Sequence, residues 1–274
     1  MGTPSSIIER FNVVQHGPPN ASTLLLLHGL GCDQTLWHPV LPYLTEYHVV
    51  VMDHWGAGRS QIDESEVAAH ASLAGYADDV LAVCNALALR DVILVGHSFS
   101  SMVALLAARQ QPDRFRHLVM LCASACYLND PPLYTGGYSE EDLTGLMTLM
   151  EQNYSEWASS VSSVAMGEQS AEAYREDLRE RFLDNNRGRL RQLAKLVFFG
   201  DHRQRLADCR VPASVLQTET DAMVPLSAAR YLADHLPNGR LEMLACPGHY
   251  PPLTHPELLG RSLGHIVDLA CPTT

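Results

Sequence analysis

Three residues of the chain could together carry out nucleophilic catalysis: Ser98, Asp221 and His249. A serine hydroxyl is a poor nucleophile at neutral pH, and an imidazole suits the role of base because its pKa lies near working pH. A carboxylate must then hold the imidazole in one tautomer and stabilise its cation. These residue types together indicate acyl-transfer chemistry.

Ser98 lies in the stretch G-H-S-F-S at residues 96–100, between an apolar run at 92–95 and a helical pattern at 102–108. A buried strand that turns directly into a helix in this way presents the serine hydroxyl at the carboxyl edge of a sheet. The flanking residues must be small because the turn is tight. Ser100 stands where a second glycine is usual, and serine is nearly as small.

The other two residues follow later strands. Asp221 comes after a strand predicted at 213–217, and His249 comes after the last predicted strand at 240–244. The chain order Ser, acid, His is a known order for such triads, and all three loops are expected at one edge of the sheet. Only Asp221 has the context D-x-x-V-P, and a preceding glycine after the last strand singles out His249. The competing residues are Asp201, Asp208 and Glu219 for the acid, and His28, His54, His97 and His255 for the base.

Two backbone amides are candidates for binding an oxyanion. An unbroken apolar run at residues 24–27 leads into H-G-L-G at 28–31, where glycines allow close approach of the backbone to a substrate. The loop after such a strand supplies one donor of the oxyanion hole, and the residue after the nucleophile supplies the other. The sequence therefore predicts the N–H groups of Leu30 and Phe99 as donors.

The order of elements predicts an α/β fold with a mostly parallel sheet flanked by helices. Early strands are predicted at 11–14, 24–27 and 47–52, with helices at 34–44 and 76–89 and a strand at 117–122. Alternating strands and helices are typical of parallel sheets. Residues 127–196 contain no buried-strand run and predict a helical cap inserted into a core formed by 1–126 and 197–274. The predicted substrate-pocket residues are His28, Tyr127, Tyr134, Tyr154, Trp157, Phe198, Met223 and Tyr250.

Composition excludes several classes of function. The 274 residues carry 19 basic and 31 acidic side chains, a formal charge of −12, and no basic stripe, which argues against nucleic-acid binding. No apolar span approaches about 20 residues, and the first residues lack the pattern of a signal peptide, so no membrane association is expected. Seven scattered cysteines are expected to be reduced thiols of a cytoplasmic protein. No metal-ligand spacing occurs, and G-A-G at 56–58 lacks the third glycine of a dinucleotide site, so no metal or cofactor is expected.

The chain resembles one branch of the α/β-hydrolases, that of bacterial RsbQ and, more distantly, of the plant strigolactone and karrikin receptors. The cap opening C-Y-L-N-D-P-P at 126–132 is the most specific match. Further matches are H-G-L-G-C-D-Q at 28–34, G-H-S-F-S-S-M at 96–102, F-F-G-D-H-R at 198–203 and G-H-Y-P-P-L at 248–253. The resemblance implies a core of eight strands, a four-helix, V-shaped cap over an apolar pocket, and the triad and oxyanion donors named above.

Two hypotheses of function follow. The first is a cofactor-independent serine hydrolase that cleaves an ester or lactone of a small, largely apolar molecule. The second, implied by the resemblance, is a signalling receptor in which ligand binding or slow hydrolysis drives interaction with a partner protein. A haloalkane dehalogenase would require Asp at position 98 and is disfavoured, whereas a cofactor-free haloperoxidase or a C–C hydrolase would share the same triad.

Overall fold

A seven-stranded sheet forms the centre of the protein in the computed structural model, which describes residues 4–167 and 170–271. The strand order is β1-β3-β2-β4-β5-β6-β7, and all neighbours are parallel except β1, which runs antiparallel to β3. The strands are β1 (Val14–His16), β2 (Thr23–Leu27), β3 (His48–Met52), β4 (Val92–His97), β5 (Phe115–Leu121), β6 (Ala213–Thr220) and β7 (Gly239–Pro247). The predicted α/β architecture is confirmed.

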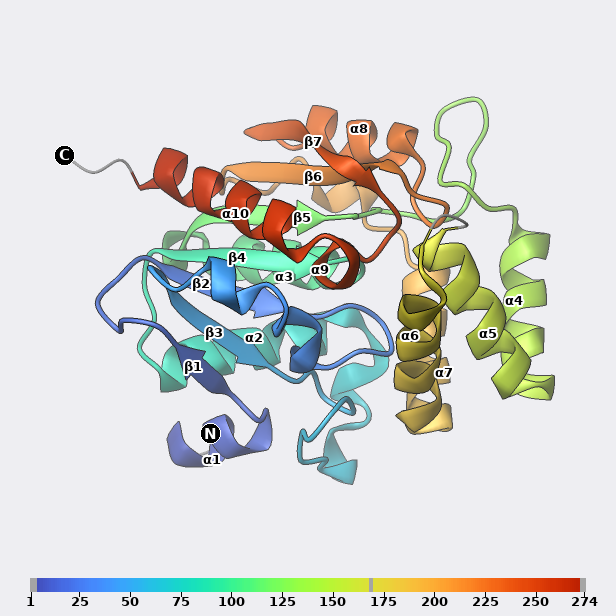
Figure 1. Ribbon diagram of the computed structural model, residues 1–274, viewed down its shortest axis with the longest axis horizontal. Coiled ribbons are helices and arrows are strands. Elements are labelled where there is room, and N and C mark those ends of the chain that lie inside the picture. The colour runs from blue at the N-terminus through green and yellow to red at the C-terminus, as the bar shows by residue number, and fades with distance from the viewer. Residues whose placement is uncertain (1–3, 168–169, 272–274) are drawn as a thin grey trace.

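The central strands are apolar along their whole length because helices cover both faces of the sheet. In β2, Leu25 and Leu27 pack into a cluster with α2 (Leu73–Ala86) and α3 (Ser100–Gln110), while Leu24 and Leu26 face α10 (Pro256–Ala270). Figure 1 shows α10 across one face and α2 and α3 across the other. The remaining helices of the core are α1 (Pro4–Arg10), α8 (Leu226–His235) and α9 (Pro251–Thr254).

Four helices lie between β5 and β6 and gather at one end of the sheet (Figure 1). They are α4 (Glu140–Gln152), α5 (Tyr154–Met166), α6 (Glu172–Asp184) and α7 (Arg187–Phe198). Side chains at the starts of α4, α5 and α7 accept hydrogen bonds from backbone N–H groups and so cap these helices. The predicted four helices are therefore present, whereas the cap boundaries at 127 and 196 and the V shape stay predictions.

Three expectations about the N-terminal half and the strand number were wrong. The resemblance implied eight strands, but the residues that the structure describes form seven, and the segment at Pro4–Arg10 before β1 is helix α1. The strand expected at 11–14 begins only at Val14, and Phe11 is apolar because it fills the core. The helix expected at 34–44 is two 3₁₀ turns, η1 (Gln34–Trp37) and η2 (Leu41–Tyr43), because Pro39 and Pro42 interrupt the backbone hydrogen bonds of a longer helix.

Within residues 4–167 and 170–271, no helix is both long and apolar enough to cross a membrane. All seven cysteines are free thiols, and six of them are buried.

Candidate active site

The turn around Ser98 has the sharp geometry that the sequence predicts. Strand β4 ends at His97 and helix α3 begins at Ser100, which leaves only two residues for the reversal. Ser98 has φ of +57°, a left-handed conformation that is uncommon for a residue with a side chain. A Cβ atom on Gly96 would lie 2.4 Å from the Ser100 carbonyl oxygen, so only glycine fits there. The turn holds the nearly buried Ser98 side chain at the carboxyl end of β4.

Ser98, His249 and Asp221 meet in one chain of hydrogen bonds. His249 Nε2 lies 2.9 Å from Ser98 Oγ, and His249 Nδ1 lies 2.8 Å from Asp221 Oδ2. Because a carboxylate can only accept hydrogen bonds, Nδ1 carries the proton and donates a hydrogen bond to Asp221. The lone pair of Nε2 is then available to accept the Ser98 hydroxyl proton. The geometry is that of a nucleophile, a base and a group that orients the base.

The Asp221 carboxylate is fixed by four donors. Oδ1 accepts hydrogen bonds from the N–H groups of Met223 at 2.8 Å and Val224 at 3.1 Å. Oδ2 accepts from His249 and from Gln217 Nε2, which lies 3.2 Å away. Burial by itself would raise the pKa of Asp221, but the charge of His249 and these hydrogen bonds outweigh it and lower the pKa. The residue is therefore a carboxylate at neutral pH.

The loop that carries His249 is held from both the core and the cap. His97 Nε2–H donates to the His249 carbonyl oxygen over 2.8 Å, and the His249 N–H donates over 2.8 Å to the carbonyl oxygen of Ala165 in α5. Burial and the nearby His249 lower the pKa of His97 to about 3, so its ring stays neutral. Gly248 has φ of +89° and a Cβ there would lie 2.9 Å from the Met166 carbonyl oxygen, so the cap packs directly on this loop.

The two predicted oxyanion donors are free amides. Among the described residues, neither the Leu30 nor the Phe99 N–H has a hydrogen-bond acceptor. Phe99 precedes the first turn of α3, where the helix dipole also favours negative charge. The carbonyl oxygen of Gly29 accepts from His28 Nδ1 at 2.9 Å and from the Cys32 N–H at 3.2 Å. Both amides are thus available to an anionic oxygen.

Three of the predicted pocket residues, Tyr127, Tyr250 and Met223, contact the triad, and Phe198 packs against Tyr127. Tyr127 is buried, and its hydroxyl lies 3.5 Å from Ser98 Oγ. The Phe198 ring packs edge-on against Tyr127 with centroids 5.4 Å apart. The Tyr250 ring centroid lies 5.4 Å from that of His249, and its hydroxyl donates to the Leu30 carbonyl oxygen over 3.3 Å. Met223 binds Asp221 through its backbone N–H.

The other predicted pocket residues have their polar and ring contacts elsewhere. Tyr154 and Trp157 stack with ring centroids 5.5 Å apart inside the cap, and the Tyr154 hydroxyl donates to the Phe182 carbonyl oxygen. The Tyr134 hydroxyl donates over 2.7 Å to the carbonyl oxygen of Cys126, at the start of the cap segment. His28 Nδ1 donates to the Gly29 carbonyl oxygen, and the His28 ring packs edge-on against that of His54 with centroids 4.7 Å apart. These contacts fill structural roles in the cap and in the loop.

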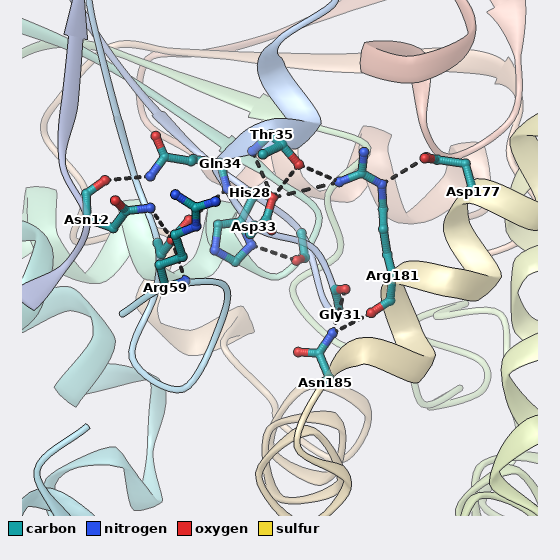
Figure 2. Close-up of polar contacts among 12 residues, drawn as sticks. Asn12, His28, Gly31, Asp33, Gln34, Thr35, Arg59, Asp177, Arg181 and Asn185 are labelled. Atoms are coloured by element: carbon teal, nitrogen blue, oxygen red, sulfur yellow. Dashed lines mark hydrogen bonds and ion pairs between the residues drawn. The ribbon is translucent and has the colours of Figure 1, made fainter. Parts of the chain in front are cut away.

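A cavity of about 380 Å³ lies between the loop after Leu30 and the turn from α6 to α7. Figure 2 shows how α6 reaches this loop. Arg181 Nη1 donates to Thr35 Oγ1 over 2.8 Å, and Asn185 Nδ2 donates to the Gly31 carbonyl oxygen over 2.9 Å. Gly31 has φ of +72°, and a Cβ there would lie 2.2 Å from Phe182 Cδ1. The cap therefore contacts the loop that carries Leu30, named the oxyanion loop, as well as the loop that carries His249.

One group of potential metal ligands occurs in the part of the chain that the structure describes. The ligand atoms of Cys122, Asp221 and His249 lie within 4.8 Å of one another. Asp221 and His249 are already hydrogen-bonded to each other, and burial raises the pKa of the Cys122 thiol well above its usual value. A thiol at this site is therefore protonated, and the group is the candidate triad with a neighbouring cysteine.

Several supporting side chains were not identified from the sequence. Gln217, Arg181 and Asn185 act across distant segments, and nothing in their local sequence indicates these contacts. Ser100 did carry a signal, because it departs from the usual glycine. His54 was considered only as a competing base, yet its Nε2 lies 2.8 Å from Ser100 Oγ.

Comparisons with known proteins agree with this geometry. A family model described as the alpha/beta hydrolase fold matches residues 22–256. The strigolactone esterase D14 of Arabidopsis thaliana is 35% identical over 261 residues, which cover 94% of this chain and 96% of the relative. The karrikin insensitive 2 receptor CA of Petunia hybrida is 34% identical over 257 residues, covering 92% and 94%. The solved structure of a hydrolase from Oleispira antarctica superposes with a TM-score of 0.94 and 33% identity over 97% of this chain and 98% of that one.

Proposed function

The chain belongs to the α/β-hydrolase family, and we propose that it is a serine hydrolase that cleaves an ester or lactone of a small, largely apolar molecule. The hydrogen-bonded series Ser98, His249, Asp221 is the observation that carries the proposal, with Ser98 Oγ 2.9 Å from the base. The esterase names of several relatives support the same class of reaction.

The proposed reaction has two stages. Ser98 Oγ attacks the substrate carbonyl carbon while its proton passes to His249 Nε2, and the carbonyl oxygen becomes an oxyanion that accepts hydrogen bonds from the Leu30 and Phe99 N–H groups. His249 then donates the proton to the leaving alkoxide, which leaves an acyl group on Ser98. In the second stage His249 takes a proton from water as the hydroxide attacks the acyl carbon. The bond between that carbon and Ser98 Oγ then breaks, His249 returns its proton to Oγ, and the carboxylic acid is released. A lactone yields a hydroxy acid by the same steps.

Side chains around Ser98 support a largely apolar substrate. The aromatic residue Tyr127 contacts the nucleophile, Tyr250 contacts the base, and Phe198 packs against Tyr127. No charged group apart from the triad contacts Ser98 Oγ among the described residues. Exclusion of water by such rings also strengthens the hydrogen bonds to the oxyanion.

Replacement of the nucleophile tests the proposal. Ser98→Ala should lower kcat on a p-nitrophenyl ester by at least about 10³-fold, because acyl transfer loses its nucleophile. Ser101→Ala is the matched control: its hydroxyl, also buried, donates over 2.7 Å to the Gly96 carbonyl oxygen and lies outside the triad. Equal activity of Ser98→Ala and the wild type would overturn the proposed function.

A second candidate is a receptor whose triad holds or slowly cleaves a ligand that then promotes binding of a partner protein. The observation that favours it is the karrikin receptor relative at 34% identity over 92% of the chain. The contacts of α5 with the His249 loop and of α6 with the oxyanion loop connect the cap surface to the site. A pull-down from the native cell, with and without a lactone, separates the two: the absence of any ligand-dependent partner leaves the simple enzyme.

A cytoplasmic location is part of the proposal, because all seven cysteines are free thiols.

A further inference from the structure

The departure at Ser100 has a structural explanation in a buried hydrogen-bond network. Ser100 Oγ donates to the carbonyl oxygen of His28, which is the last residue before the oxyanion loop. Ser100 Oγ also lies 2.8 Å from His54 Nε2. Because the serine hydroxyl proton is used toward His28, Oγ must accept the proton of His54 Nε2. All three residues are at most 2% exposed.

A second connection joins His54 to His28. The His54 backbone N–H donates over 3.1 Å to His28 Nε2, so that nitrogen carries a lone pair and His28 Nδ1 carries the proton. Nδ1–H then donates over 2.9 Å to the carbonyl oxygen of Gly29. Burial lowers the pKa of both His28 and His54, so both rings stay neutral and keep these tautomers.

The carbonyl of Gly29 belongs to the same peptide plane as the Leu30 N–H. In a trans peptide the C=O and N–H bonds point in opposite directions, so fixing one fixes the other. His28 Nδ1–H and the Cys32 N–H both bind the Gly29 oxygen on one side, which directs the Leu30 N–H to the other side. The network therefore reaches from α3, the helix that follows the Ser98 turn, to the Leu30 N–H, one of the two oxyanion donors.

We propose that Ser100 and His54 are positioning residues that, through His28, orient the Leu30 N–H toward the oxyanion. The inference rests on the proposed function and concerns the same site. Ser100, the last residue of the G-H-S-F-S stretch, then does more than satisfy the need for a small residue. It joins the helix that follows the nucleophile to the loop that binds the developing charge. His97, in the same turn, supports the loop that carries His249 in a similar way, through its hydrogen bond to the His249 carbonyl oxygen.

A trifluoromethyl ketone tests this role directly. Ser98 Oγ adds to the ketone carbon, its proton moves to His249, and the ketone oxygen becomes an anion facing the two amides. The corresponding methyl ketone binds without forming this anion and reports binding of the substrate ground state. Deletion of one oxyanion donor typically lowers kcat by about 10²–10³-fold, so misdirecting one should weaken the trifluoromethyl ketone at least about 10-fold.

The experiment compares three variants. Ser100→Ala and His54→Leu should each weaken the trifluoromethyl ketone and lower kcat by a similar factor, with KM and methyl ketone affinity unchanged. The double variant should lose no more than either single one, because both act through the same series of bonds. Ser101→Ala is the control, since it removes a buried serine hydroxyl from the same helix without touching the oxyanion loop. Thermal unfolding of all variants identifies any loss that comes from misfolding.

The outcomes separate the two proposals. A wild type that forms the hemiketal while Ser100→Ala and His54→Leu bind the trifluoromethyl ketone as tightly overturns the positioning role and leaves the hydrolase intact. Equal weakening of both ketones, or an equal effect of Ser101→Ala, also overturns it. A wild type that forms no hemiketal and hydrolyses no ester overturns the proposed function and this inference with it.

Discussion

Replacement of Asp221 by asparagine should abolish most of the catalytic activity by changing the tautomer of His249, without changing the structure of the site. The two backbone N–H groups of Met223 and Val224 face Oδ1, so the asparagine must keep its oxygen at that position. Its NH₂ group then takes the place of Oδ2 and points at His249 Nδ1. An amide NH₂ can only donate, so the imidazole must carry its proton on Nε2, which can no longer accept the Ser98 proton.

The expected loss is large. Forcing the wrong tautomer in a serine triad lowers kcat by about 10⁴-fold, which corresponds to about 5.5 kcal/mol of activation free energy. Rotation of the Gln217 amide would let its Oε1, which has no partner among the described residues, accept from the new NH₂, at the cost of the hydrogen bond from Gln217 Nε2 to the Val224 carbonyl oxygen. KM should change little, since the Asp221 side chain is fully buried and closed to a substrate.

Two measurements check this prediction. Steady-state hydrolysis of a p-nitrophenyl ester gives kcat, and ¹⁵N NMR of labelled histidine shows which ring nitrogen of His249 carries the proton. Asp201→Asn is the matched control, because its carboxylate pairs with Arg203 at the surface and should leave kcat within about twofold. An Asp221→Asn enzyme with Nδ1 still protonated, or with kcat within tenfold of the wild type, would refute the reasoning.

Three further perturbations test the surroundings of the triad. His97 becomes protonated below about pH 6.5 in the unfolded state but only below about 3 in the folded state. Lowering the pH from 7 to 5 should therefore reduce the free energy of unfolding by about 2 kcal/mol through this residue. His97→Gln should remove that part of the loss in urea unfolding, and an unchanged pH dependence would contradict it. Asn185→Ala should lower the free energy of unfolding by about 1 kcal/mol and kcat severalfold, because the Gly31 carbonyl oxygen loses its hydrogen-bond donor. Wild-type values of both quantities would argue against the cap contact. Gly31→Ala should cost at least about 2 kcal/mol in thermal unfolding, since φ is +72° and the Cβ would overlap Phe182; an unchanged Tm would contradict this.

Local patterns predicted the parts of the fold that local physics decides. The apolar runs at β2 and β4 are fully buried strands, because only strands covered on both faces are continuously apolar. The strand expected at 11–14 was wrong at Phe11, because an apolar residue that packs into the core outside a strand has the same local pattern as one in an edge strand. Pro39 and Pro42 were visible in the sequence, and they explain why two short turns replace the expected helix.

The candidate triad could be predicted because each member follows its own strand in a sheet whose carboxyl edges align. The contacts that support the triad could not be predicted, because they join segments far apart in the chain. Examples are the contacts of Asn185 with Gly31 and of His97 with the His249 carbonyl oxygen. Ser100 lies between these cases. Its type was a visible irregularity, but its meaning depends on a histidine 46 positions earlier that only the fold brings within 2.8 Å.

Covalent labelling tests the central claim most directly. Incubation of the full chain with a fluorophosphonate, followed by intact-mass measurement and peptide mapping, should show one phosphonyl group per chain, attached to Ser98. Ser98→Ala should gain no mass, and His249→Ala should react far more slowly because the nucleophile loses its base. Labelling of another residue, or of Ser98→Ala at the wild-type rate, would contradict the assignment of Ser98 as the nucleophile.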